Sequence, residues 1–314
     1  MKNTKIKVAI LGAASHIAKG MIFNFKDDES IELHCYARNF EKVRSFSMLI
    51  NYKNLILKTF SEFNDDRIDV IINCIGITYT SVLNPLNENV FELTEKYDNL
   101  ILDYIRENRE TTYINFSSGA VYGTSFNQPA SITTITSIDV NNIRTEDYYR
   151  IAKLNSEVKH RSLNYCNIID LRIFGYYSRF IDLTKNYLMT DIISSIKQRR
   201  TLKTSPNNII RDYVHPIDLS NLIKACFEAK KINEVLDVKS KKPISKMEIL
   251  LFFKQNYDLK FEIIEDYREH SATGEKLNYY SENNNSEILK FIPKYTSFEC
   301  VKMETEALFE LFPR

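Results

Sequence analysis

Apolar runs that end at glycine or small polar residues alternate with helix-like runs over residues 5–175. The clearest is Asp69 to Ile77, which reads Asp-Val-Ile-Ile-Asn-Cys-Ile-Gly-Ile. Continuous apolar runs of this kind are typical of parallel strands that helices cover on both faces. Similar runs lie at 5–11, 31–37, 112–116 and 167–174. Strands that alternate with helices predict an α/β fold built on a Rossmann-type, doubly wound parallel sheet.

Residues of chemical interest gather where these predicted strands end. Ligands of doubly wound sheets bind at the carboxyl ends of the strands. The residues at those ends are Gly12, Arg38, Gly76, Ser118 and Gly175. The chain has only seven glycines, so glycine at a strand end indicates a need of the backbone rather than filler. We therefore expect one ligand site along this edge of the sheet.

The segment after the first strand has the layout of a dinucleotide-binding loop. Gly12, Ser15 and Ala18 occupy the three positions of a Gly-x-x-Gly-x-x-Gly pattern, with small residues in place of two glycines. Backbone N–H groups at the start of the following helix, around His16 and Ile17, can bind a pyrophosphate. We predict that these five residues bind a cofactor. An ordinary strand–turn–helix connection would carry the same pattern.

The end of the second strand bears on which dinucleotide is bound. NAD-binding folds usually place Asp or Glu there to bind the ribose 2′-hydroxyl. Tyr36, Ala37 and Arg38 stand in that region instead. Arg38 suits a 2′-phosphate, so we expect NADP(H), with NAD(H) as the alternative if Arg38 is only a solvated charge.

Tyr149 and Lys153 stand four residues apart in Tyr-Arg-Ile-Ala-Lys, and Ser118 precedes them. This spacing puts both side chains on one face of a helix. A nearby ammonium favours the phenolate and lowers the pKa of a tyrosine, which then serves as a general acid and base. The serine hydroxyl can bind the same substrate oxygen. An isolated pair of this kind would be read as two exposed helical residues, so the order of the other motifs matters.

Composition excludes several classes of function. The net charge of +1 gives no basic field for nucleic acid. No apolar run approaches the 18 or so residues that span a membrane, and Met1 to Lys7 does not resemble a signal peptide, so we expect a cytoplasmic protein. The five cysteines and five histidines form no metal-binding spacing, and we expect reduced cysteines and no metal.

With these motifs in their order, the chain resembles the extended short-chain dehydrogenase/reductases of the NAD-dependent epimerase/dehydratase group. The resemblance covers essentially the whole length. It is carried by Gly12 to Ala18, Asn73 to Gly76, Ser117 to Gly123, Tyr149 to Lys153 with Glu157, Leu171 to Phe174, Arg211 to His215, and Leu236 to Val238 followed by Ile244-Ser245.

The resemblance implies a cofactor domain of residues 1–175 plus about 209–238. A smaller C-terminal α/β substrate domain would comprise about 176–208 and 239–314. It implies a nucleotide-sugar substrate, and a homodimer that pairs through the helix carrying Tyr149 and Lys153. In the family, Tyr149 is the acid/base and Lys153 lowers its pKa and holds the nicotinamide ribose. Ser118 contacts the reacting oxygen.

The resemblance also assigns residues outside the catalytic three. Cys74, Ile75 and Gly76 would contact the cofactor. Arg211 would hold the diphosphate of the substrate, a task that suits the arginine fork. An interdomain salt bridge is the other interpretation of Arg211. The identity of the sugar would depend on residues such as Tyr79, Thr80, Tyr177, Arg179 and Tyr187.

Two departures from the family pattern bear on which reaction the chain catalyses and which tyrosine is catalytic. Gly119-Ala120 stand where its dehydratases carry an Asp-Glu pair for water elimination, so we set dehydration aside as the reaction. Tyr148 replaces the usual proline before the catalytic tyrosine and is the rival to Tyr149, but the spacing to Lys153 favours Tyr149.

Three functions remain open after these departures. The favoured one is an NADPH-dependent reductase of a nucleotide-linked 4-keto (6-deoxy) sugar, as in deoxysugar and surface polysaccharide synthesis. The alternatives are a nucleotide-sugar 4-epimerase with tightly bound NAD and a non-catalytic dinucleotide-sensing protein.

Overall fold

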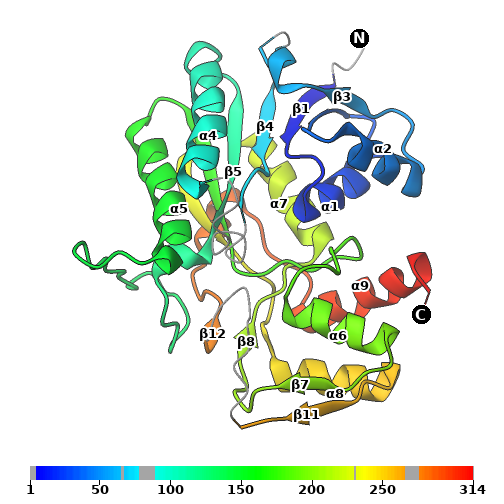
Figure 1. The fold of residues 1–314 in the computed structure, drawn as a ribbon. Helices are drawn as coiled ribbons and strands as arrows, with labels where there is room; N and C mark the ends of the chain where they lie inside the picture. Colours follow the sequence, from blue (N-terminus) through cyan, green and yellow to red (C-terminus); the bar gives the residue numbers. More distant parts are fainter. Residues whose placement is uncertain (1–4, 65–66, 78–88, 230, 266–275, 314) are drawn as a thin grey trace.

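The computed structural model describes residues 5–64, 67–77, 89–229, 231–265 and 276–313. A parallel sheet flanked by helices forms its larger part (Figure 1). The strands of this sheet are β1 (Ile6–Leu11), β2 (Ile31–Tyr36), β3 (Ile56–Lys58), β4 (Val70–Asn73), β5 (Thr112–Ser118), β6 (Asn167–Ile173) and β9 (Asn233–Val238). Its helices are α1 (His16–Phe25), α2 (Phe40–Leu49), α4 (Val90–Glu107), α5 (Thr145–Ser162) and α7 (Pro216–Glu228).

The order of the strands in the sheet indicates where a ligand would bind. The seven strands lie in the order β3-β2-β1-β4-β5-β6-β9, and each neighbouring pair is parallel. The chain runs outward from β1 in one direction to β3 and then crosses to β4 and runs in the other. The carboxyl ends of β1 and β4 therefore flank the crevice where doubly wound sheets bind ligands. The predicted fold class is confirmed.

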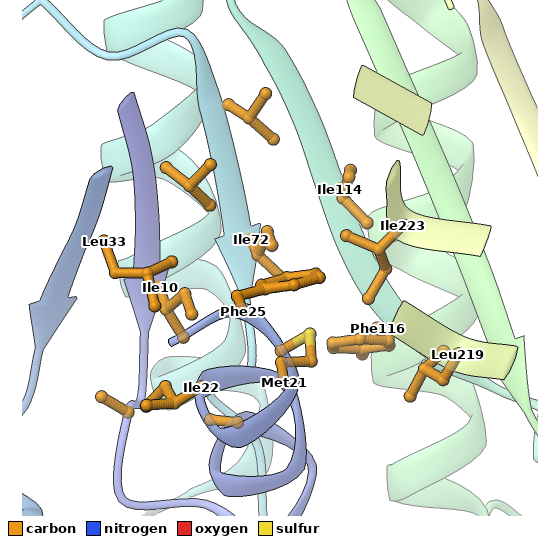
Figure 2. Close-up of a cluster of buried hydrophobic side chains, with 14 of the residues drawn as sticks. Ile10, Met21, Ile22, Phe25, Leu33, Ile72, Ile114, Phe116, Leu219 and Ile223 are labelled. Atoms are coloured by element: carbon orange, nitrogen blue, oxygen red, sulfur yellow. The ribbon is translucent and has the colours of Figure 1, made fainter. Parts of the chain in front are cut away.

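Alternate residues of one strand pack on opposite faces of the sheet. Val8 and Ile10 of β1 belong to a core with α1 and α7, whereas Ala9 and Leu11 belong to a core with α4. Figure 2 shows the first core, in which side chains of α1 lie against Ile10 and other strand residues. Burial on both faces explains why these strands read as continuous apolar runs.

The remaining elements follow β6 in the chain, and several of them form a second core. They are α6 (Leu188–Lys197), β7 (Leu202–Thr204), β8 (Ile210–Arg211), β10 (Ile244–Ser245), α8 (Lys246–Tyr257), β11 (Phe261–Ile263), β12 (Asn278–Tyr279) and α9 (Ser297–Leu311). Apolar side chains of α6, α8 and α9 pack together below the sheet (Figure 1). β12 lies parallel to β8, which pairs with β10. We propose that the two cores belong to the two domains predicted from the sequence.

Side-chain caps explain where the observed boundaries differ from the predicted ones. β4 ends at Asn73, before the predicted end near Gly76, because the Asn73 side chain accepts the Ile75 N–H at 3.0 Å and turns the chain. α4 begins at Val90, where Asn89 caps its first turn by accepting the Phe91 N–H. Ser245 and Glu248 form a capping box at the start of α8.

Candidate active site

A cavity of about 1500 Å³ opens at the carboxyl edge of the sheet and extends towards the C-terminal elements. It collects most of the predicted site residues. Those that line it are Ser15, His16, Ile17, Arg38, Cys74, Ile75, Gly76, Ser118, Tyr149, Lys153 and Arg211. Within the described chain, Gly12 and Ala18 are not part of the lining: Gly12 turns the loop, and Ala18 is fully buried in α1.

The loop between β1 and α1 is held close to the end of β4. Gly12 has φ +77°, and a Cβ there would lie 3.0 Å from the carbonyl carbon and oxygen of Cys74. Only glycine meets both conditions without strain. The N–H groups of Gly12 and Ala13 both donate to the carbonyl of Tyr36 at the end of β2. The loop is therefore held against the ends of β2 and β4, the strands on either side of β1.

The start of α1 is suited to an anion. Ser15 caps the helix by accepting the Ala18 N–H at 3.3 Å. The first-turn N–H groups of a helix have no partner within it and carry positive partial charge. His16 and Ile17 place this turn on the cavity wall. The tight glycine turn and the open helix start fit the pyrophosphate of a dinucleotide.

The His16 side chain fixes this loop to the segment after β6. Its Nε2 lies 2.8 Å from Ser178 Oγ, and its ring packs edge-on against Tyr176 with centroids 4.9 Å apart. Burial lowers the pKa of His16 to about 4. The imidazole is therefore neutral at physiological pH, and His16 offers its backbone rather than a charge to an anion.

Arg38 lies at the far end of the cavity, beside the start of α2. Its side chain is exposed, and Glu41, Lys42 and Ser45 of α2 line the same wall. Asn39 caps α2 by accepting the Lys42 N–H at 3.0 Å. Arg38, Lys42 and Glu41 thus bring two cations and one carboxylate to this end of the cavity, and Lys19, which also lines the cavity, lies near Lys42.

The three predicted catalytic residues meet on one wall of the cavity. Ser118 ends β5, and Tyr149 and Lys153 lie one turn apart on α5. Ser118 lies near enough to the Tyr149 phenol for its hydroxyl to lower the pKa of Tyr149. Glu157, one turn further along α5, accepts Ser117 Oγ at 2.5 Å and pairs with Arg172 at 2.6 Å. These buried bonds fix α5 against β5 and β6 and so position the catalytic wall.

The expectation that Lys153 lowers the pKa of Tyr149 stays a prediction; in this structure the ammonium binds a main-chain acceptor. Lys153 Nζ donates to the carbonyl of Phe116 at 2.7 Å, so the main chain of β5 holds the ammonium. Burial raises the pKa of Tyr149, and the nearby Ser118 hydroxyl offsets only part of that rise. Burial also lowers the pKa of Lys153. Helical spacing put the two residues on one face, but the acceptor on β5 decides where the ammonium lies.

Two residues that line the cavity, Lys276 and Tyr279, were not predicted as site residues from the sequence. Tyr279 of β12 places its hydroxyl 3.2 Å from Ser118 Oγ, although the residues are 161 positions apart. Lys276 lies beside it, with Nζ 4.3 Å from the centre of the Tyr279 ring. Arg211 Nη1 donates to the carbonyl of Lys276 at 2.7 Å. No spacing or motif connects these residues to Ser118, so only the fold brings them together.

The residues expected to select the sugar are scattered. Tyr79 and Thr80 lie outside the described residues. Tyr177 is fully buried in the C-terminal core and bonds to Thr305 at 2.9 Å. Arg179 pairs with Glu304 of α9 at 2.7 Å. Only Tyr187 of the described ones lines the main cavity.

The described parts of the chain have neither a membrane-spanning helix nor a candidate metal site. None of their helices has the length and apolarity needed to cross a bilayer. Within the same parts, His, Cys, Asp and Glu side chains do not gather into a possible metal site.

Comparisons with known proteins agree with this geometry. The model of the NAD dependent epimerase/dehydratase family matches residues 8–238. No curated protein matched the sequence significantly. Among solved structures, UDP-glucuronic acid 4-epimerase from Bacillus cereus, in complex with UDP-glucuronic acid and NAD, has 15% identity and a TM-score of 0.79 over 98% of this chain and 100% of that chain.

Two other solved structures show the same fold. UDP-glucose-4-epimerase from Stenotrophomonas maltophila has a TM-score of 0.80 at 14% identity, covering 98% of both chains. dTDP-glucose 4,6-dehydratase from Bacillus anthracis, in complex with NAD, has a TM-score of 0.76 at 14% identity, covering 98% of this chain and 97% of that chain.

Proposed function

Because the chain belongs to the NAD-dependent epimerase/dehydratase family, we propose that it is an NADPH-dependent reductase of a nucleotide-linked 4-keto (6-deoxy) sugar. One observation carries the proposal: Ser118, Tyr149 and Lys153 share a cavity with the start of α1. A proton donor and a dinucleotide site in one cavity are what carbonyl reduction requires.

The chain would hold the cofactor along the sheet edge. His16 and Ile17 would bind the pyrophosphate through their N–H groups, and Arg38 would pair with the 2′-phosphate. Lys153 would hold the nicotinamide ribose. NADPH supplies a hydride when it is bound. The solved structures that resemble this chain include complexes with NAD. They support a nicotinamide dinucleotide as the cofactor without distinguishing NADP from NAD.

The protonation of Tyr149 supports reduction. A phenol whose pKa is raised stays protonated at neutral pH. Tyr149 would donate this proton to the carbonyl oxygen as the carbon is reduced, while Ser118 donates a hydrogen bond to the same oxygen. Alcohol oxidation, the first step of an epimerase, would need the phenolate instead. Arg211 would bind the diphosphate of the substrate.

Water elimination does not fit the residues after Ser118. A Cβ at Gly119 would lie 2.4 Å from ring atoms of Phe174, which leaves no room for the aspartate that the family's dehydratases carry. Ala120 follows on the cavity wall. The site thus lacks at these positions the carboxylate pair that elimination uses.

The second candidate is a nucleotide-sugar 4-epimerase that keeps NAD bound. Glu41 on the cavity wall favours it, because a carboxylate at this end can accept the ribose hydroxyls of NAD. Two of the solved structures with this fold are named as 4-epimerases. It would use the same three catalytic residues.

Cofactor titration distinguishes the two. Purified protein would be titrated with NADPH and NADH by fluorescence, beside Arg38→Ala and the matched control Arg44→Ala, an exposed arginine of α2 that is not on the cavity wall. A reductase should prefer NADPH, lose that preference only in Arg38→Ala, and oxidise NADPH with a nucleotide-linked 4-keto sugar. NAD that co-purifies and survives turnover would establish the epimerase instead.

A non-catalytic dinucleotide sensor is the third possibility. Retention of the three catalytic residues argues against it. If Tyr149→Phe left the biological activity of the protein intact, the sensor would replace the reductase.

We also propose a homodimer through α5. This helix packs beside α4 on one side of the sheet (Figure 1), and Val158 of α5 is 61% exposed. Val158→Glu should convert a dimer to a monomer in light scattering. A wild-type protein that is monomeric at high concentration would remove this proposal.

A further inference from the structure

Lys276 brings an ammonium group to the substrate end of the cavity, beside the proposed catalytic serine. Its Nζ lies 4.3 Å from the ring centre of Tyr279 and 5.2 Å from that of Phe126. The Tyr279 hydroxyl in turn lies 3.2 Å from Ser118 Oγ. One aromatic ring therefore separates the ammonium from the place where the substrate carbonyl would bind.

Among the described residues, the charged side chains that shift the pKa of Lys276 are both cationic. Burial, Arg211 of β8 and Arg150 of α5 together lower the pKa of Lys276 to about 8. Arg150 is paired with Asp147 at 2.8 Å. Arg211 uses Nη1 on the main-chain carbonyls of Ile210 and Lys276 at 2.9 and 2.7 Å.

The rings of Tyr279 and Phe126 stabilise the buried ammonium of Lys276 without bringing a negative charge to it. Cation–π contacts with Tyr279 and Phe126 offset part of the desolvation of the ammonium. They do not neutralise it. Three cationic side chains that line the cavity, Lys276, Arg150 and Arg211, favour the binding of an anion there.

We propose that Lys276 binds an anionic group of the substrate, either a phosphate of a nucleoside diphosphate or a carboxylate on the sugar. The inference deepens the proposed function and rests on it for the nucleotide-sugar site. A phosphate would place the diphosphate between Arg211 and Lys276. A carboxylate would make Lys276 the residue that selects an acidic sugar over a neutral one.

Calorimetric binding to the full-length chain, saturated with its dinucleotide, tests the proposal. The probes are UDP, dTDP, UDP-glucose, UDP-glucuronic acid, inorganic pyrophosphate and glucuronate. The variants are Lys276→Met, which removes the charge and keeps an apolar stem, and Lys276→Arg, which keeps the charge. Lys203→Met, an exposed lysine of β7 away from the cavity, is the matched control.

Loss of a charge-assisted contact should weaken binding by roughly 10-fold to 100-fold in Lys276→Met. Lys276→Arg should restore most of the affinity, and Lys203→Met should bind as the wild type. If the anion is a phosphate, UDP or dTDP shows the full loss. If it is a sugar carboxylate, only UDP-glucuronic acid and glucuronate show it.

Proton uptake gives a second readout that a folding defect does not imitate. Near pH 8 the wild type should take up protons as the anion binds, because the anion stabilises the charged lysine. This uptake, seen by comparing buffers of different ionisation heat, should be absent in Lys276→Met. Equal affinities and equal uptake in the two proteins, or wild-type protein that binds none of the probes, would overturn the proposal. Lysine-dependent anion binding without any turnover would refute the proposed reaction and leave this inference standing.

Discussion

The buried histidine of α5 gives the sharpest test of what holds the catalytic wall in place. His160 has no exposed surface and lies between two carboxylates, with Nε2 2.7 Å from Asp98 of α4 and Nδ1 2.9 Å from Asp170 of β6. Lys159 and Arg161 contact the outer oxygens of the two carboxylates at 2.7 and 2.8 Å. The network joins α4, α5 and β6 behind Lys153.

Burial alone would lower the pKa of His160, but Asp170 and Asp98 outweigh it and raise the pKa to about 9. Below pH 6.5 the imidazole is charged in both the folded and the unfolded chain, so its stabilising contribution is complete. Between pH 6.5 and 9 the unfolded chain releases the proton and the folded chain keeps it, so stability falls. Since one pKa unit corresponds to about 1.4 kcal/mol, the contribution amounts to about 3 kcal/mol.

His160→Gln removes the cation that the two carboxylates share. The expected loss in the free energy of unfolding is about 3 kcal/mol at about pH 6, at the low end for a broken buried pair because Lys159 and Arg161 remain. Urea denaturation at about pH 6 and about pH 10 measures it. The difference between wild type and variant should be large at the lower pH and small at the higher one.

His34→Gln is the matched control. His34 is a buried imidazole of β2 that pairs with one partly exposed carboxylate, Glu32, at 2.7 Å. It should cost less stability than His160→Gln at the lower pH. A difference between wild type and His160→Gln that is the same at both pH values would refute the reasoning, because it would show that the charge on His160 contributes nothing.

Three further predictions concern the cavity. Tyr149→Phe should lower kcat by about 100-fold to 10,000-fold and leave dinucleotide binding unchanged, as steady-state kinetics and fluorescence titration will show; near-normal turnover would exclude Tyr149 as the proton donor. Gly12→Ala should cost about 1–3 kcal/mol in urea denaturation and weaken the dinucleotide, because φ is +77° and the new Cβ meets Cys74 at 3.0 Å; unchanged binding would mean that the loop does not need its tight turn. Loss of the charge of Lys276, whose pKa is about 8, should make kcat/KM fall as pH rises through that value, and Lys276→Arg should flatten this fall; an alkaline limb that persists in the variant would belong to another group.

The sequence predicted the sheet well because strand signals are local. The apolar runs of β1, β2, β5 and β6 come from burial on both faces, a requirement that each run carries in its own residues. The boundary of β4 was predicted less well. Its last predicted residues are apolar, but the Asn73 side chain ends the strand by accepting the Ile75 N–H, and an apolar pattern does not report such a bond.

The candidate site was predicted in part for the same reason. Residues at strand ends converge in any parallel sheet of this order, so Ser118 and Gly76 could be placed on one edge from spacing alone. The i, i+4 spacing also put Tyr149 and Lys153 on one helix face. It did not indicate that the carbonyl of Phe116 would bind the ammonium, since the acceptor belongs to another element.

The sequence by itself determined the order of strands and helices, the glycine turn after β1 and the chemistry available at the strand ends. The regular repeats of helix and strand convert spacing into geometry only within an element or between adjoining ones. Only the tertiary structure decided that Tyr279 and Lys276 join Ser118, and that Asp98 and Asp170 enclose His160. Those contacts depend on how distant segments pack against one another, and no repeat along the chain encodes that packing.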